Sequence, residues 1–128
     1  MKHRVYTRCK YDTDQEVADR LKLTRRFTLP ALLAQERHTP FGWVWLCQPR
    51  HSEMITASLR EGGWKGEIAF NEMKMTRHYE NNIVTRLGFQ VKTGDEDIQT
   101  ALDSDDWVHP RWINQVQDYW SVVPGGRS

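Results

Sequence analysis

An almost unbroken apolar run, FGWVWLCQ (Phe41–Gln48), constrains the fold of this chain more than any other feature. A strand that alternates apolar and polar residues has one buried face, whereas a continuous apolar strand is buried on both faces. Strands of the second kind are typical of parallel sheets that are covered by helices. The run therefore predicts a central strand in a largely parallel sheet.

Expected strands and helices alternate on either side of this run. We predict further strands at Arg4–Cys9, Trp64–Phe70 and Asp97–Asp103, and helices at Gln15–Gln35, Ser52–Arg60 and after Pro110. Residues 71–97 are polar and poorly periodic, and no element is assigned within them. The alternation predicts an α/β protein, a Rossmann-like layered α/β/α fold with a mostly parallel sheet. We expect one domain over residues 1–122 and a flexible C-terminal tail, 123–128.

Local signals mark the ends of the helices. Asp12, Thr13 and Asp14 offer N-caps for the first helix. Pro30 either kinks that helix or opens a second short one, PALLAQ. Gly62 and Gly63 close the helix that begins near Ser52, and the last helix carries an apolar stripe through Ile113, Val116 and Trp120, widened by Trp112 and Tyr119.

Composition excludes several classes of protein. The formal net charge is only +1, from 18 basic and 17 acidic residues, so we expect no nucleic-acid binding. Neither an apolar leader nor a long apolar run is present, so we expect no membrane span and a cytoplasmic location. Cys9 and Cys47 lie far apart in apolar stretches, which favours buried free thiols in a reducing compartment. Most of the six Trp are expected in the core.

The stretch LDSDDWVHPRW (Leu102–Trp112) carries the strongest functional signal. Asp103 and Asp105 are two residues apart, so in extended backbone their side chains point the same way and can share a hard divalent cation such as Mg²⁺. The alternative is structural, because acidic residues also cap helices and offset the helix dipole. A calcium-binding loop fails on spacing, since Val108 and Asn114 occupy the positions that require Gly and Glu.

The order of the pieces resembles a GT-A type glycosyltransferase, and within that group the bacterial rhamnosyltransferase family most of all. The corresponding stretches are YTRC (Tyr6–Cys9), TLPALLAQ (Thr28–Gln35), FGWVWLCQ and IQTALDSDDWVHPRWINQVQ (Ile98–Gln117). The match is spread over most of the chain, although only the last stretch is specific.

The resemblance implies a role for each residue of the motif. Asp103 and Asp105 would hold a divalent cation, Mn²⁺ or Mg²⁺, against the diphosphate of a nucleotide-sugar, and Asp106 would bind a sugar hydroxyl or a metal-bound water. Arg8 and Gln48 match positions that border the nucleoside pocket. The implied activity is transfer of a hexosyl or rhamnosyl group from a nucleoside-diphosphate sugar to a glycan or another hydroxyl acceptor.

Three departures from the family pattern qualify that expectation. Ala101 stands where relatives often have Arg, and Gln48 stands where many have Asp. The stretch that carries the acceptor site and the general base in relatives has no counterpart here, so no catalytic base is nominated. The resemblance therefore covers the nucleotide-sugar-binding half of a truncated GT-A fold, and an oligomer or a partner chain would have to cover the other half. The rival hypothesis is a non-catalytic α/β interaction or structural domain in which the acidic turn only caps a helix.

Overall fold

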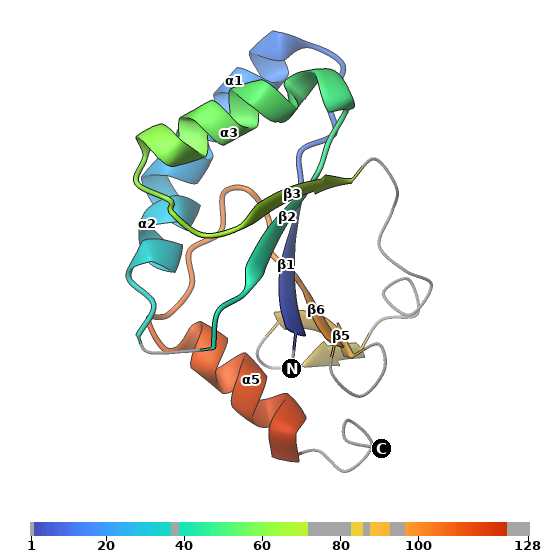
Figure 1. Ribbon diagram of the computed structural model, residues 1–128, viewed down its shortest axis with the longest axis vertical. Helices are drawn as coiled ribbons and strands as arrows, with labels where there is room; N and C mark the ends of the chain where they lie inside the picture. Colours follow the sequence, from blue (N-terminus) through green and yellow to red (C-terminus); the bar gives the residue numbers. More distant parts are fainter. Residues whose placement is uncertain (1, 37–38, 72–82, 86–87, 93–96, 123–128) are drawn as a thin grey trace.

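The computed structural model describes residues 2–36, 39–71, 83–85, 88–92 and 97–122, and its centre is a six-stranded sheet (Figure 1). The strands are β1 (Lys2–Arg8), β2 (Gly42–Leu46), β3 (Ile68–Asn71), β4 (Ile83–Thr85), β5 (Gly88–Lys92) and β6 (Asp97–Ala101). The helices are α1 (Asp14–Leu23), the π-helix η1 (Thr24–Thr28), α2 (Leu29–Leu33), the 3₁₀ turn η2 (Pro49–His51), α3 (Ser52–Glu61) and α5 (Trp112–Val122).

The strand order is β3-β2-β1-β6-β5-β4. The first four of these strands are mutually parallel, with Val5 opposite Trp43 on one side and Thr100 on the other, and β5 and β4 add an antiparallel edge. This confirms the predicted Rossmann-like α/β class with a mostly parallel sheet. The hairpin of β4 and β5 lies within residues 71–97, where sequence patterning assigns no element.

The described helices α1, α2, α3 and α5 cover one face of the sheet (Figure 1). Alternate residues of β1 face them, and Val5, Thr7 and Cys9 are fully buried there, whereas Arg8 on the other face is exposed. Side chains from these strands and helices form one hydrophobic cluster. The described part of the chain contains no helix on the opposite face, so the second helical layer of the expected α/β/α arrangement is not seen in these residues.

The first helical segment is continuous but changes type midway. Thr13 is its N-cap, and Thr13 and Glu16 form a capping box in which each side chain accepts a hydrogen bond from the other's backbone N–H. In the π-helical turn, Leu29 N–H donates to the Thr24 carbonyl five residues earlier. Pro30, which has no N–H to donate, then falls in the first turn of α2. Of the two alternatives for Pro30, a kink in the first helix or the start of a second short helix, the structure shows the second.

The other expected elements are present with shifted ends. α3 closes at Gly62 as predicted, and Gly63 has φ 102°, a left-handed backbone that favours glycine. β3 begins at Ile68 rather than Trp64, and Trp64 packs in the core instead. α5 begins at Trp112, two residues beyond Pro110. The predicted tail, 123–128, lies outside the described residues.

Most of the tryptophans are core residues, as expected. Trp43, Trp45, Trp64 and Trp112 are buried, whereas Trp107 in the acidic turn is 65% exposed. The side chain of Trp120 lies outside the described part of the structure. Both cysteines are buried free thiols, which agrees with the expectation for Cys9 and Cys47.

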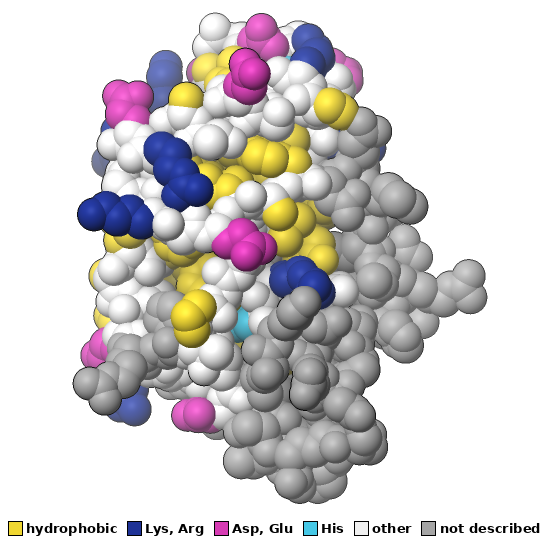
Figure 2. Space-filling view, in the orientation of Figure 1, with side chains coloured by type: hydrophobic (Ala, Val, Ile, Leu, Met, Phe, Trp, Pro, Cys, Tyr) yellow, Lys and Arg dark blue, Asp and Glu magenta, His cyan; other side chains and the backbone are white. Residues whose placement is uncertain are grey.

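The face drawn in Figure 2 has no large patch of a single charge, because basic and acidic side chains are interspersed on it. No helix in the described part of the chain is long and apolar enough to cross a membrane.

Candidate metal centre

The acidic turn begins where β6 ends, beside the carboxyl end of β1. Leu102 N–H donates to the Tyr6 carbonyl at 2.9 Å, so the hydrogen-bond ladder between the two strands runs on into the turn. The chain leaves β1 toward β2 and β3, whereas β6 lies on the other side of β1. Strand order therefore reverses between β1 and β6. In open α/β sheets, ligands bind beyond the carboxyl ends of the strands at such a reversal.

The three carboxylates of the turn converge. Asp103, Asp105 and Asp106 each offer one oxygen, and these oxygens lie within 4.8 Å of one another. Two oxygens on opposite sides of a bound Mg²⁺ are about 4.2 Å apart, so a small side-chain rotation would bring the three into its coordination range. All three side chains are exposed. Carboxylate oxygens are suitable ligands for a hard cation, and the residues present fit one.

The turn is also held together internally. Asp106 N–H donates to the Asp103 carbonyl at 3.1 Å, and Asp103 N–H donates to Asp106 Oδ2 at 3.1 Å. These reciprocal bonds occupy one carboxylate oxygen of Asp106. They fix the backbone that carries Asp105.

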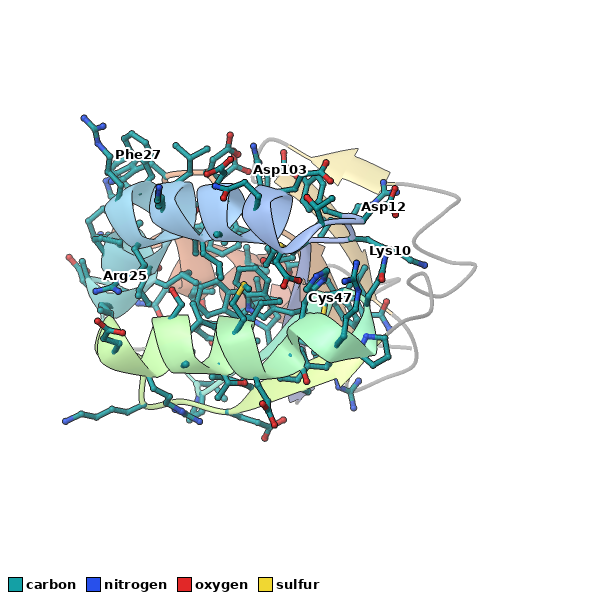
Figure 3. The ribbon with its side chains drawn as sticks, turned by 90° about the horizontal axis from the view of Figure 1, so that it is seen from above. Lys10, Asp12, Arg25, Phe27, Cys47 and Asp103 are labelled. Carbon is teal, nitrogen blue, oxygen red and sulfur yellow. The ribbon has the colours of Figure 1, made fainter. Side chains whose placement is uncertain are left out.

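Two buried threonines of the π-helix anchor this turn to the fold. Thr24 Oγ1 donates to the Ser104 carbonyl at 2.6 Å, and Thr28 Oγ1 donates to the Asp106 carbonyl at 2.6 Å. Arg20 adds a bond from Nε to Ser104 Oγ at 3.1 Å. Figure 3 shows Asp103 alongside α1, on the side of that helix away from α3. The placement of the turn therefore depends on α1 and η1.

Sequence reasoning did not identify these anchoring residues. A signal was present, because positions 17, 21, 24, 28 and 32 form one stripe along a helix, in which Val17, Leu21 and Leu32 are buried apolar residues. Thr24 and Thr28 interrupt that stripe with hydroxyl groups and are fully buried. A hydroxyl on the core face of a helix needs a partner, and here the partner is the acidic turn.

Burial and charge repulsion act on the turn's carboxylates. Asp106 is exposed overall, but partial burial of its carboxyl group raises its pKa; the hydrogen bond from the Asp103 backbone opposes that rise, and the charges of Asp103 and Asp105 add to it. Arg20 Nη2 lies 3.5 Å from Asp105 Oδ1 and supplies a partial counter-charge at a half-exposed position. A cation bound among the carboxylates would relieve the remaining repulsion.

The helix-capping explanation of the acidic residues does not hold for α5. That helix begins at Trp112, its first turn contains no acidic residue, and Trp112 N–H donates to the His109 carbonyl at 2.9 Å. Gln35 bridges the same region, because its amide donates to the His109 carbonyl and accepts from Ile113 N–H. The acidic cluster therefore lies upstream of the helix start rather than at it.

The two expected nucleoside-pocket residues lie at the same edge of the sheet. Arg8 ends β1 opposite Leu46 and is exposed. Gln48 follows β2, where its amide donates to the Tyr11 carbonyl at 3.0 Å and accepts from Arg50 Nε at 3.0 Å. β1 lies between β2 and the acidic turn. The structure thus gathers the three aspartates, whereas Gln48 is engaged with the loop between β1 and α1.

A buried histidine was also missed from the sequence. His51, at the start of α3, is fully buried and its Nε2 lies 3.0 Å from Asp14 Oδ1 at the start of α1. The contact ties together the two helices that leave this edge of the sheet. Asp14, expected only as a cap, therefore has a tertiary role.

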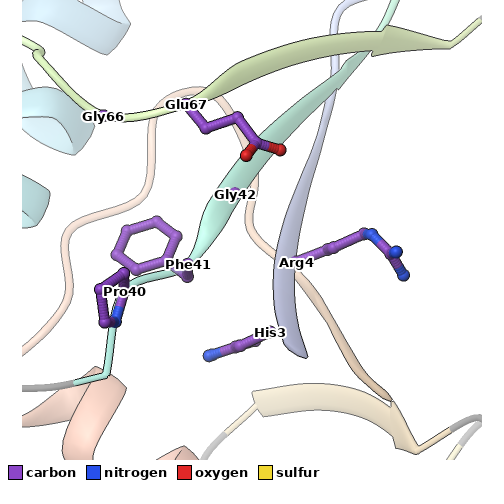
Figure 4. A pocket seen from close by; sticks show the side chains of 7 residues that line it. All are labelled: His3, Arg4, Pro40, Phe41, Gly42, Gly66 and Glu67. Atoms are coloured by element: carbon purple, nitrogen blue, oxygen red, sulfur yellow. The ribbon is translucent and has the colours of Figure 1, made fainter. Parts of the chain in front are cut away.

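A cavity of about 320 Å³ lies at the opposite ends of the strands, near the amino ends of β1 and β2 (Figure 4). The acidic turn does not contribute to its walls. The candidate metal centre is accordingly an exposed cluster at the carboxyl ends of the parallel strands, separate from this cavity.

Comparison of the chain with protein-family models, with curated proteins and with solved structures found no match. The fold and the cluster define an α/β protein with converging carboxylates at a strand-order reversal.

Proposed function

We propose that this chain binds a nucleoside-diphosphate sugar through a divalent cation, Mn²⁺ or Mg²⁺, held by Asp103 and Asp105. It would act as the nucleotide-sugar-binding part of a glycosyltransferase that transfers a hexosyl or rhamnosyl group. The observation that carries the proposal is the position of the converging carboxylates, beside the reversal of strand order between β1 and β6. The resemblance of the IQTALDSDDWVHPRWINQVQ stretch to GT-A type glycosyltransferases supports the same function.

A cation at this point would assist the proposed chemistry. Departure of a nucleoside diphosphate develops negative charge on the leaving oxygen, and a divalent cation stabilises that charge as a Lewis acid. Arg20, beside Asp105, would add positive charge near the phosphates. Arg8 and Gln48 would border the nucleoside. The free carboxylate oxygen of Asp106 would bind a sugar hydroxyl or a metal-bound water.

The proposal covers half of a transfer reaction. The acceptor, a glycan or another hydroxyl compound, needs a positioned base, and no residue of the described chain is nominated for that role. A partner chain or a second copy of the protein would supply the acceptor side.

One observation favours a second candidate, a non-catalytic interaction or structural domain. The reciprocal bonds between Asp103 and Asp106 and the approach of Arg20 to Asp105 give the acidic turn partners without a cation. In that case the carboxylates would serve to shape an exposed turn. Capping of α5 does not explain the acidic residues, because that helix begins further along the chain, at Trp112.

Calorimetric titration separates the two candidates. UDP, GDP and dTDP are titrated into the protein with Mn²⁺ and with EDTA. We expect metal-dependent binding of at least one nucleotide, lost in Asp103→Ala and Asp105→Ala. Glu53→Gln removes an exposed carboxylate of α3 and is the matched control, which should bind as the wild type does. Absence of binding to all three nucleotides, with and without metal, would establish the interaction domain instead.

A further inference from the structure

The two cysteines of the chain lie side by side in the sheet. Arg8 of β1 is opposite Leu46 of β2, and Cys9 N–H donates to the Leu46 carbonyl at 2.9 Å. In a parallel ladder, such an N–H bonds to the residue that precedes its own partner in the neighbouring strand. The partner of Cys9 is therefore Cys47, and the pairing of β1 with β2 continues one residue beyond the ends of both strands.

The side chains of both cysteines point to the helix-covered face of the sheet. Side chains alternate along a strand, and Thr7 and Trp45, which are opposite each other, are fully buried on that face. Cys9 and Cys47 each follow two residues later and are buried as well. Figure 3 shows Cys47 between α1 and α3, and both cysteines belong to the core that these helices cover. The two thiols therefore leave neighbouring strands on the same side.

This placement meets the spacing that a disulfide requires. Neighbouring strands lie about 4.8 Å apart, and the two Cα atoms of a disulfide are usually about 4.4–6.8 Å apart. Both cysteines are free thiols in the structure. Because they share one face of the sheet, rotation of their side chains can bring the two sulfur atoms together while the strands stay paired.

Burial governs how such thiols react. Burial raises the pKa of Cys9 to about 11, and the charge of Cys47 adds to that rise, which shows that the two groups sense each other. The thiolate is the reactive form, so Cys9 is slow to react at neutral pH, and its burial excludes bulky reagents. Once one sulfur has been oxidised by a small reagent, the neighbouring thiol is closer to it than a second reagent molecule.

We propose that Cys9 and Cys47 form a reversible disulfide when the protein is oxidised by hydrogen peroxide. The thiolate of one cysteine attacks a peroxide oxygen, the O–O bond breaks, and a sulfenic acid forms with release of hydroxide. The thiol of the other cysteine then attacks that sulfur, so that the S–S bond forms and water leaves. The two cysteines together lose two electrons and two protons, and the peroxide is reduced to two molecules of water.

The disulfide would act at the carboxyl ends of β1 and β2. Cys9 directly precedes the loop that leads to α1, and Cys47 directly precedes the loop that leads to α3. Oxidation would therefore join the two loops covalently at their origin, which makes this end of the sheet sensitive to redox conditions. The inference does not rest on the proposed glycosyl transfer.

Mass spectrometry of the full chain tests the pairing. The folded protein is treated with millimolar hydrogen peroxide, the remaining thiols are alkylated in denaturant, and the chain is digested without reductant. We expect a peptide pair joined through Cys9 and Cys47 within the monomer, and dithiothreitol should restore both thiols. Two unmodified thiols, sulfinic or sulfonic acids as the main products, or a disulfide between two chains would each overturn the proposal.

Single variants test whether each cysteine needs the other. Cys9→Ser and Cys47→Ser each keep one thiol and remove its neighbour, and circular dichroism establishes that they are folded. In peroxide, neither variant should form a disulfide within the chain, and dimedone should trap the sulfenic acid of the remaining cysteine. Reversible loss of that thiol in a monomeric single variant, at the wild-type rate and without trapping by dimedone, would contradict the pairing.

Discussion

The hydroxyl of Thr28 donates a 2.6 Å hydrogen bond to the backbone carbonyl of Asp106, joining the π-helix to the acidic turn. Thr28 is fully buried, so its hydroxyl has little access to water. We expect Thr28→Val, which keeps the shape of the side chain, to lower the free energy of unfolding by about 1–3 kcal/mol. Urea denaturation measures the change. Thr28→Ser keeps the hydroxyl and should lose less, whereas a valine variant as stable as the wild type would show that the bond is unimportant.

A similar bond lies in the core between two neighbouring strands. Trp43 Nε1–H donates to Thr7 Oγ1 at 2.8 Å, and both residues are fully buried. Thr7→Val would leave the indole N–H buried without an acceptor, and we expect a loss of about 1–3 kcal/mol in unfolding free energy. Thr7→Ser retains the acceptor and is the control. Equal destabilisation by valine and serine would point to lost packing instead of the lost bond.

The Cys9 thiol predicts a loss of stability in alkaline solution. Burial, with a smaller effect from Cys47, raises the pKa of Cys9 from 9.0 to about 11. The protonated thiol is thus favoured in the folded state, and its contribution to stability is complete below pH 9.0 and is lost as the pH rises through about 11. Between these values the wild type should lose stability more steeply than Cys9→Ala, as measured by urea denaturation at successive pH values. Parallel curves for the two proteins would contradict the assignment.

Asp106 predicts a pH effect in the metal-free protein. Burial raises its pKa, so the contribution of its protonated form is present below the carboxyl pKa of the unfolded chain and is lost as the pH rises through the folded value. Asp106→Asn retains an oxygen that can accept from Asp103 N–H but does not ionise. The free energy of unfolding of Asp106→Asn minus that of the wild type, measured in EDTA, should therefore be larger at pH 7 than at pH 3.5. The same stability difference at both values would show that ionisation of Asp106 is not costly.

Local patterns were sufficient for the elements that carry the fold. The apolar run at Phe41–Gln48 predicted β2, and the strand–helix alternation predicted the parallel sheet, because burial on both faces leaves its mark on consecutive residues. The capping box at Thr13 and the second helical segment at Pro30 also follow from local chemistry. The hairpin of β4 and β5 was not predicted, because its strands are short and lie in a polar stretch.

The acidic turn shows where such patterns stop. Its composition marked Asp103 and Asp105, but not the hydroxyls of Thr24 and Thr28 that position it, which lie more than 70 residues away in the chain. The cavity near the amino ends of β1 and β2 has the same origin, since its lining residues Arg4, Gly42 and Glu67 come together only after β1, β2 and β3 have paired. Periodicity records which face of an element is buried, so the class of fold can be read from it. Contacts between distant segments depend on strand order and register, and those arise only when the whole sheet assembles.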